Sequence, residues 1–380
     1  MKGIHWKLGT CLAAVGAAAM MMTGCASTGS AVAESTSAED AAAENVSAEG
    51  DSAAADTEQD TEAEAAEGTA GATESGSAVY PMTIKHALGE TTLEKQPENV
   101  VAIGWGNLDV PLALGIAPTG VSKPTFGKTE DNGLFSWTNE AFKDLGVDEP
   151  NVFDDTDGLN FESIHNAHPD VILAAYSGIS QEEYEQLSEI APTVAYSKEA
   201  WATSWQEMTR EDAAPLGKAD EAEKLIAELE KLIREKAAEH PELQGVTAAY
   251  CYFDTTNLSS FSVYMPKDPR AAYLQDLGLT LPDEITSLDD GSFFFMTVSA
   301  ENIDVLNNLD LIVAWGEDDT LKTMQEDSLI SQVPAVRRGS VAFLSNNSAL
   351  ISASCTPTPL SIPATLEEYL DLLSGAAAKL

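Results

Sequence analysis

Basic residues are scarce in this chain. Of its 380 residues, 20 are Lys or Arg and 62 are Asp or Glu, which gives a formal net charge of −42. A protein that binds nucleic acid or anionic lipid through its surface needs clustered Lys and Arg to neutralise phosphate groups. The charge balance therefore excludes nucleic acid as a partner and disfavours a basic membrane-binding patch.

Cysteine and histidine are also few, with four and five residues. The cysteines lie too far apart for a disulfide-dense scaffold or a CxxC metal knot. His165 and His168 are three residues apart, but two exposed histidines on one helix are poor evidence for a metal, so we expect no direct metal site. The sequence does not tell whether Cys251 and Cys355 are bridged, and we favour two free thiols.

No apolar run is long enough to indicate a membrane-spanning helix. Lys2 and Lys7 precede a short apolar stretch over residues 8–22, and Cys25 follows after Thr23-Gly24. This order is typical of a secretory signal, which we assign to residues 1–24. Its end resembles the lipobox of bacterial lipoproteins, in which the cysteine is lipidated, so Cys25 is the predicted anchor. An ordinary signal peptide with a chance cysteine is the alternative.

Residues 25–79 contain almost no group that could build a core. The segment has 13 acidic residues after Cys25 and neither a basic nor an aromatic residue. Such a composition cannot bury enough apolar surface to fold. We therefore predict a disordered acidic tether that ends where the folded part begins, at Tyr80.

The remainder of the chain predicts an α/β fold. Largely apolar runs at 100–103, 171–175, 246–250 and 310–315 alternate with helical segments, as in parallel sheets covered on both faces. Residues 219–239 carry an apolar stripe at helical spacing and predict one long helix. We expect an N-terminal lobe over 80–215, a connecting helix over 216–240 and a C-terminal lobe over 241–380.

The two predicted lobes repeat a local pattern. Asn160 and Ser299 are candidate helix caps, and Glu162 and Glu301 each lie two residues after the cap. Each of these helices leads to an apolar strand that ends near an aromatic residue, Tyr176 or Trp315. The repeated order predicts two similar α/β lobes.

Motifs of common enzymes are missing. The sequence has no GxSxG elbow, HExxH pair, P-loop or dinucleotide fingerprint, and no histidine in a glycine-rich loop suited to activating a nucleophile. We therefore predict a protein that is not an enzyme. A secreted hydrolase is the alternative from a different functional class.

Residues 80–380 resemble the iron–siderophore substrate-binding proteins of ABC transporters, the helix-linked class of periplasmic binding proteins that serve permeases of the FecCD type. The matching stretches include residues 83–89, Gly104-Trp105-Gly106, 175–184, 264–270, 299–302 and 359–363. The resemblance implies two lobes, each with a mostly parallel central sheet, joined by one long helix. It implies a ferric siderophore in the cleft between them, with iron present only as part of that ligand and no cofactor. A haem or cobalamin receptor on the same fold is the alternative.

The resemblance also implies partners. In this family one glutamate on each lobe pairs with arginine on the permease, and the motif positions here are Glu162 and Glu301. A permease and, through it, a cytoplasmic ATPase would complete the transporter. We expect an exported monomer, held at the extracytoplasmic face of the cell membrane by its lipid anchor alone. Whether the cell has an outer membrane is not readable from the sequence.

Ligand-binding residues are expected at the carboxyl ends of strands and in nearby loops. Aromatic side chains suit the apolar faces of a siderophore, and a scarce loop arginine suits its oxygen atoms. The predicted ligand-binding residues are Trp105, Trp137, Tyr176, Trp201, Arg210, Tyr264, Arg270 and Trp315. Because basic residues are not clustered, the sequence favours a hydroxamate or mixed siderophore of low charge over a tris-catecholate. The particular siderophore and its affinity stay open.

Overall fold

The computed structural model describes residues 78–380, except 292 and 318. The predicted signal over 1–24, Cys25 and almost all of the predicted tether over 25–79 lie outside the described residues. A β-hairpin opens the described part, with β1 (Met82–His86) antiparallel to β2 (Gly89–Leu93).

The first lobe is built on a parallel five-stranded sheet in the order β5-β4-β3-β6-β7. Its strands are β3 (Val100–Ala102), β4 (Gly120–Ser122), β5 (Val152–Phe153), β6 (Val171–Ala174) and β7 (Thr193–Ala195). β3, β4, β6 and β7 are buried along their whole length, because helices pack on the sheet. These helices are α2 (Asp109–Ala113), α3 (Ser136–Asp144), α4 (Phe161–Asn166), α5 (Gln181–Ile190) and α6 (Trp205–Ala213).

The second lobe has a mixed five-stranded sheet in the order β10-β9-β8-β11-β12. Its strands are β8 (Ala248–Phe253), β9 (Ser260–Tyr264), β10 (Phe295–Ser299), β11 (Leu311–Trp315) and β12 (Val341–Leu344). β8, β11 and β12 run parallel, whereas β9 and β10 form an antiparallel extension at one edge. The helices of this lobe are α8 (Pro269–Asp276), α9 (Asp283–Thr286), α10 (Thr320–Glu326), α11 (Pro334–Arg338) and α12 (Leu350–Cys355), and η3 (Ala300–Leu306) is a 3₁₀ helix.

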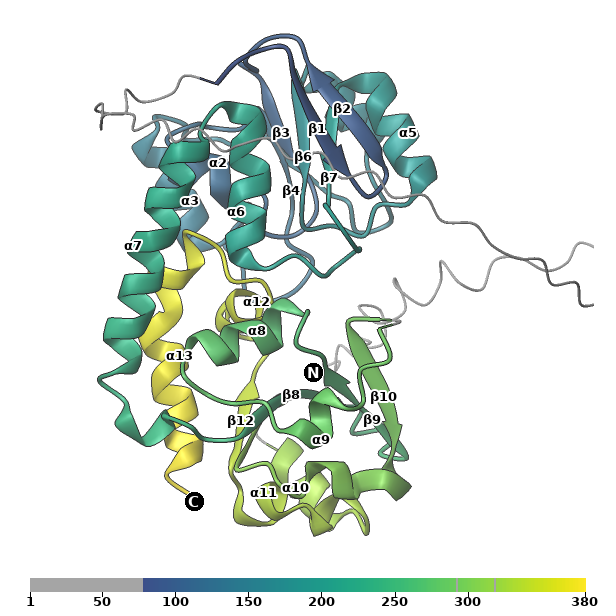
Figure 1. Ribbon diagram of the computed structural model, residues 1–380, viewed down its shortest axis with the longest axis vertical. Helices are drawn as coiled ribbons and strands as arrows, with labels where there is room; N and C mark the ends of the chain where they lie inside the picture. Colours follow the sequence, from purple (N-terminus) through teal and green to yellow (C-terminus); the bar gives the residue numbers. More distant parts are fainter. Residues whose placement is uncertain (1–77, 292, 318) are drawn as a thin grey trace, which may run out of the picture. The chain divides into compact units, whose positions relative to one another are not determined.

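One long helix, α7 (Ala219–Ala237), joins the lobes. Its stripe of Ile226, Leu229 and Ile233 is buried, while Lys and Glu cover the other face. α7 contacts α6 of the first lobe and both α8 and the C-terminal helix α13 (Ser361–Ala377) of the second. Figure 1 shows it running beside both lobes. The predicted fold class is confirmed, and the lobe boundaries at 215 and 241 remain our assignment.

Candidate ligand-binding cleft

Trp105 and Tyr176 lie where the chain order of the first sheet reverses. The strands before them, β3 and β6, are neighbours, and the connections on either side of this point leave toward opposite edges. Asn107 ties the two loops together: the Tyr176 amide donates to its Oδ1 at 2.9 Å, and its Nδ2 donates to the Tyr176 carbonyl at 3.0 Å. Such a switch point is the usual place for a ligand on an open α/β sheet.

An aromatic wall extends from Trp105. Its ring centroid lies 4.8 Å from that of Phe126 and 4.8 Å from that of Trp201, and Tyr176 meets Trp201 edge-on at 5.4 Å. Tyr176 is fully buried, whereas Trp105 and Trp201 are partly exposed. We refer to Trp105, Phe126, Tyr176 and Trp201 below as the first-lobe wall.

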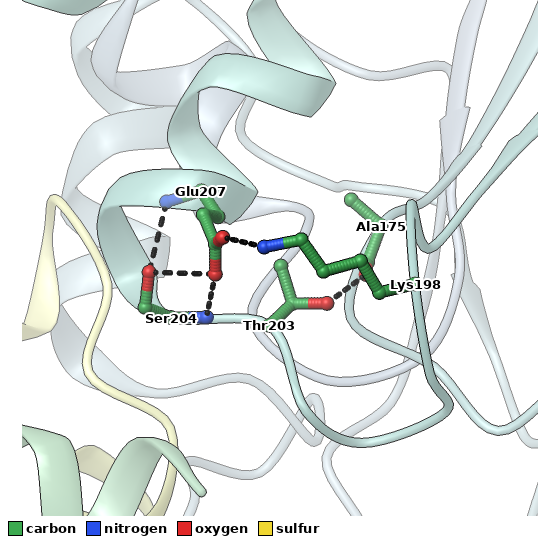
Figure 2. A network of polar contacts seen from close by, with 5 residues as sticks. All are labelled: Ala175, Lys198, Thr203, Ser204 and Glu207. Atoms are coloured by element: carbon green, nitrogen blue, oxygen red, sulfur yellow. Dashed lines mark hydrogen bonds and ion pairs between the residues drawn. The ribbon is translucent and has the colours of Figure 1, made fainter. Parts of the chain in front are cut away.

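The loop that carries Trp201 is held by a local polar network (Figure 2). Ser204 caps α6 in a reciprocal arrangement with Glu207, and Lys198 Nζ lies 2.8 Å from Glu207 Oε1. Thr203 Oγ1 donates to the Ala175 carbonyl at 2.9 Å, which fixes the loop against the end of β6. The loop is therefore set in place by contacts within the first lobe.

The second lobe contributes a buried ion pair. Asp268 caps α8 by accepting from the Arg270 amide at 2.8 Å, and Arg270 Nη1 lies 2.5 Å from Asp268 Oδ2. The guanidinium also lies over the Tyr264 ring, 4.3 Å from its centroid. Burial raises the pKa of Asp268 to about 6, and Arg270 limits that rise, so the pair is ionised at neutral pH.

Trp315 reaches the same region through Tyr250. Its Nε1 donates to the Tyr250 hydroxyl at 2.8 Å, and that hydroxyl faces Cys355 Sγ at 3.4 Å. Tyr250 in turn meets Tyr264 edge-on at 5.5 Å. Cys355 and Cys251 are both buried free thiols, as the sequence favours. Trp315, Tyr264 and Arg270 thus belong to one connected group at the carboxyl ends of β11 and β9.

The groups from the two lobes face one another. Phe126, Trp201 and Trp315 pack against one hydrophobic cluster that consists mainly of second-lobe residues and also includes Trp205 and part of α7. Burial raises the pKa of the Tyr176 hydroxyl, and Arg270 across the interface opposes this rise. The first-lobe wall and the Asp268–Arg270 pair therefore meet between the lobes, and we refer to this region, together with the cavity beside it, as the cleft.

A cavity adjoins this cleft on the side of Trp105 and Phe126. It encloses about 430 Å³, part of it open to solvent, between residues 104–138 and residues 352–361. Asp109 lines it and accepts from Trp137 Nε1 at 3.1 Å, Thr138 Oγ1 at 3.0 Å and Thr358 Oγ1 at 2.5 Å. Burial raises the pKa of Asp109 to about 6, although these three donors oppose the rise.

Some predicted site residues lie elsewhere. Arg210 is on α6 and pairs with Glu223 on α7, with Nε 2.7 Å from Oε1, so its charge braces two helices and does not face the cleft residues. Glu162 and Glu301 are exposed in the first turns of α4 and η3. Trp137 lines the adjoining cavity, where its indole donates to Asp109. Its contact with a ligand stays a prediction.

Sequence reasoning missed Asn107 and Asp109. Asn107 lies between β3 and α2 and Asp109 is the first residue of α2, and a polar residue in apolar surroundings was the available signal. Thr358 was also missed, because its partner Asp109 is 249 residues away in the chain.

The described residues lack two features that would change this interpretation. No group of three or more His, Cys, Asp or Glu side chains is placed to hold a metal ion. Among the helices of the same residues, none has the length and apolar character needed to cross a bilayer.

Two α/β lobes joined by a single helix, with an aromatic cleft between them, define a helix-linked solute-binding protein. The sequence pattern of the periplasmic binding protein family matches residues 100–347, and the chain belongs to this family. The family consists of substrate-binding proteins.

One solved structure and two named relatives are similar to this chain over most of its length. The structure of PiaA from Streptococcus pneumoniae, in complex with ferrichrome, is 43% identical, with a TM-score of 0.76 over 78% of this chain and 99% of that one. The petrobactin-binding protein YclQ of Bacillus subtilis is 26% identical over 69% of this chain and 80% of its own length. The ferric enterobactin-binding periplasmic protein FepB of Escherichia coli is 25% identical over 70% and 84%.

Proposed function

We propose that the chain is an extracytoplasmic receptor that binds a ferric siderophore in the cleft between its lobes and delivers it to an ABC permease for iron uptake. Relatives named for binding petrobactin and ferric enterobactin, and a similar structure in complex with ferrichrome, support the ligand class. Within that class we propose a ferric hydroxamate or mixed siderophore of low net charge.

The observation that carries the ligand proposal is the pairing of Arg270 with Asp268 beneath an aromatic cleft. The pair adds no net charge to the cleft floor, so it offers little compensation for a strongly anionic tris-catecholate complex. Arg270 Nε has no hydrogen-bond partner among the described residues, which leaves one donor for a chelate oxygen. The proposed ligand contacts are Trp105, Tyr176, Trp201, Tyr264, Arg270 and Trp315.

Tryptophan-quenching titration of residues 80–380 tests this proposal. Trp105, Trp201 and Trp315 all report on the cleft, so a ferric siderophore bound there should quench emission with one-to-one stoichiometry. We expect saturable quenching by ferric trihydroxamates and weaker binding of ferric tris-catecholates, haem and cobalamin. Tight binding of a catecholate without hydroxamate binding would contradict the charge argument. Release of an altered product would indicate an enzyme instead.

Glu162 and Glu301 are the proposed permease contacts. Both are exposed acidic residues in the first turn of a helix that precedes a central strand, β6 in one lobe and β11 in the other. A carboxylate at a helix N-terminus stabilises that helix by about 0.3–1 kcal/mol, so a structural role accompanies the proposed docking role. Equivalent positions on two similar lobes suit a permease with two-fold symmetry.

The double variant Glu162→Arg with Glu301→Arg should keep siderophore affinity and lose uptake by cells, because each new cation would repel a basic docking partner. Glu182 and Glu326, which are exposed on other helices, provide the matched control as a Glu182→Arg, Glu326→Arg pair. Normal uptake with the first pair would refute the docking assignment. We further propose that Cys25 carries the lipid anchor and that the receptor works as a monomer.

A further inference from the structure

One ion pair joins the two loops that carry the cleft residues. Lys267 Nζ lies 2.8 Å from Glu199 Oε2, although the two residues are 68 positions apart. Glu199 lies between β7 and α6 in the first lobe, two residues before Trp201. Lys267 lies between β9 and α8 in the second lobe, next to the buried Asp268–Arg270 pair.

Two charged neighbours of this pair have partners within their own lobes. Lys198 is paired with Glu207 within the first lobe, and Asp268 is paired with Arg270 within the second. Lys267 also donates to the Gly291 carbonyl at 3.2 Å, in the segment that leads to the aromatic run at 293–295. Its ammonium group therefore connects three segments that each bear aromatic side chains of the cleft or its border.

A second polar contact between the lobes has a different position. Trp205 Nε1 donates to Asp276 Oδ2 at 3.0 Å, and these residues belong to α6 and α8, which both contact the connecting helix α7. The Trp205–Asp276 contact therefore lies beside α7. The Glu199–Lys267 pair instead lies on loops that extend to the cleft, so a rotation of one lobe about α7 that opens the cleft would separate it.

We infer that Glu199 and Lys267 form an interlobe clasp, a pair of positioning residues that holds the cleft closed over a bound ligand. The inference rests on the proposed function, since it assigns the clasp to the rate of ligand release. Neither residue needs to touch the ligand. The side chains are 53% and 24% exposed, so the attraction is moderate and is screened by salt.

Loss of the clasp should speed dissociation more than it slows association, because it acts on the closed complex. An ion pair of this exposure corresponds to a change of about three- to fivefold. We expect that increase in the dissociation rate of ferrichrome for Lys267→Gln or Glu199→Gln at low ionic strength. Lys267→Glu should have a larger effect, about tenfold, because it places two carboxylates together.

The decisive variant exchanges the charges. Glu199→Lys combined with Lys267→Glu restores attraction, so its dissociation rate should return toward that of the unaltered protein, whereas each single reversal should be fast. Stopped-flow release of ferrichrome, measured at about 20 mM and about 500 mM salt, should show that the difference between Lys267→Gln and the unaltered protein disappears at high salt. Lys236→Gln is the control, since it removes a 2.6 Å ion pair to Glu367 between α7 and α13, at a lysine of similar exposure.

Spin labels on the two lobes give a second measurement that needs no ligand. Lys85 and Lys322 are exposed positions in the first and second lobes, and pulsed electron spin resonance reports the distance between labels placed there. A broader or longer distance in Lys267→Gln supports the clasp even if no ferric hydroxamate binds and the proposed function fails. Unchanged release rates in the single and exchanged variants overturn the clasp, as does an unchanged distance distribution if ferrichrome does not bind.

Discussion

Trp201 is a bulky side chain on a backbone conformation that favours glycine. Its φ is +61°, and its amide donates to the Ser177 carbonyl at 3.1 Å. This conformation costs free energy and persists only where surrounding contacts impose it. The indole lies across Gly178, because a Cβ there would stand 2.1 Å from Trp201 Nε1. The position of Trp201 in the first-lobe wall thus depends on Gly178.

Gly178→Ala should expel Trp201 from this position while the rest of the lobe stays folded. The added methyl overlaps the indole, and Gly178 does not have a positive φ that would strain alanine. We expect affinity for ferrichrome to fall about tenfold, since one aromatic contact surface is lost. Quenching titrations and the tryptophan emission maximum provide the measurement.

Gly375→Ala is the matched control, because a Cβ there meets no atom within 4 Å and the residue lies in α13. It should bind as tightly as the unaltered protein and gain about 1 kcal/mol of helix stability. Unaltered affinity and emission in Gly178→Ala would show that Trp201 does not depend on this glycine.

At the residue scale, the positions of aromatic residues after apolar strands predicted Trp105 and Tyr176 as ligand contacts. The structure places both at the switch point of the first sheet, and their contact with a ligand stays a prediction. Only 1% of Tyr176 is exposed, because it packs in a hydrophobic cluster with Val110 and Met208. Its other neighbours include Arg270 and Thr356 of the second lobe, which lie 94 and 180 residues away in the chain and could not be predicted from the local sequence.

At the scale of elements, apolar continuity and helix caps were sufficient for most of the fold. The runs predicted as strands match β3, β6, β8 and β11 within two residues at most ends, and the apolar stripe predicted α7. The segment after Ser299 is a 3₁₀ helix with a break at Asn302, which an N-cap signal alone does not distinguish from an α-helix. Boundaries depend on packing partners that a single segment does not reveal.

Contacts between elements were harder to predict. Arg210 and Glu223 come from consecutive helices, and an arginine near a tryptophan in sequence was interpreted as a cleft residue. The Glu199–Lys267 and Asp109–Thr358 contacts join segments that only the packed lobes bring together. The sequence therefore offered candidate loops for the ligand, but not the polar pairs that hold those loops.

At the scale of the whole molecule, the acidic residues fall into an exposed majority and a few that are largely buried. Residues 80–380 contain 49 acidic and 18 basic residues, and nearly all of those acids are at least partly exposed. A few are buried, and burial raises their pKa values: to about 6 for Asp109 and Asp268, and to about 7 for Glu211. These buried acids make the stability of the fold depend on pH in a direction opposite to that of an ordinary salt-bridged carboxylate.

The free energy of unfolding should fall as the pH rises from about 5 to about 8. Each of these three acids has a folded-state pKa above its unfolded value of 3.8 or 4.5, so the folded chain binds more protons in this interval. The proton-binding difference then favours folding below the unfolded pKa, and this contribution is lost as pH rises through the folded pKa. Carboxylates with lowered pKa, such as Asp170, act oppositely, but they lose their contribution only near and below their ordinary pKa.

Glu211→Gln tests this assignment directly. Burial is the largest cause of the raised Glu211 pKa, and repulsion from Glu207 adds to it, so a neutral amide should be tolerated better than the carboxylate at pH 8. We expect the variant to be more stable than the unaltered protein at pH 8 by on the order of 1 kcal/mol, and equal to it near pH 5. Thermal and urea unfolding across this interval provide the measurement. If Glu211→Gln keeps the full pH dependence of the free energy of unfolding, the titrating groups lie elsewhere. If the unaltered protein is more stable at pH 8 than at pH 5, exposed ion pairs outweigh the buried acids.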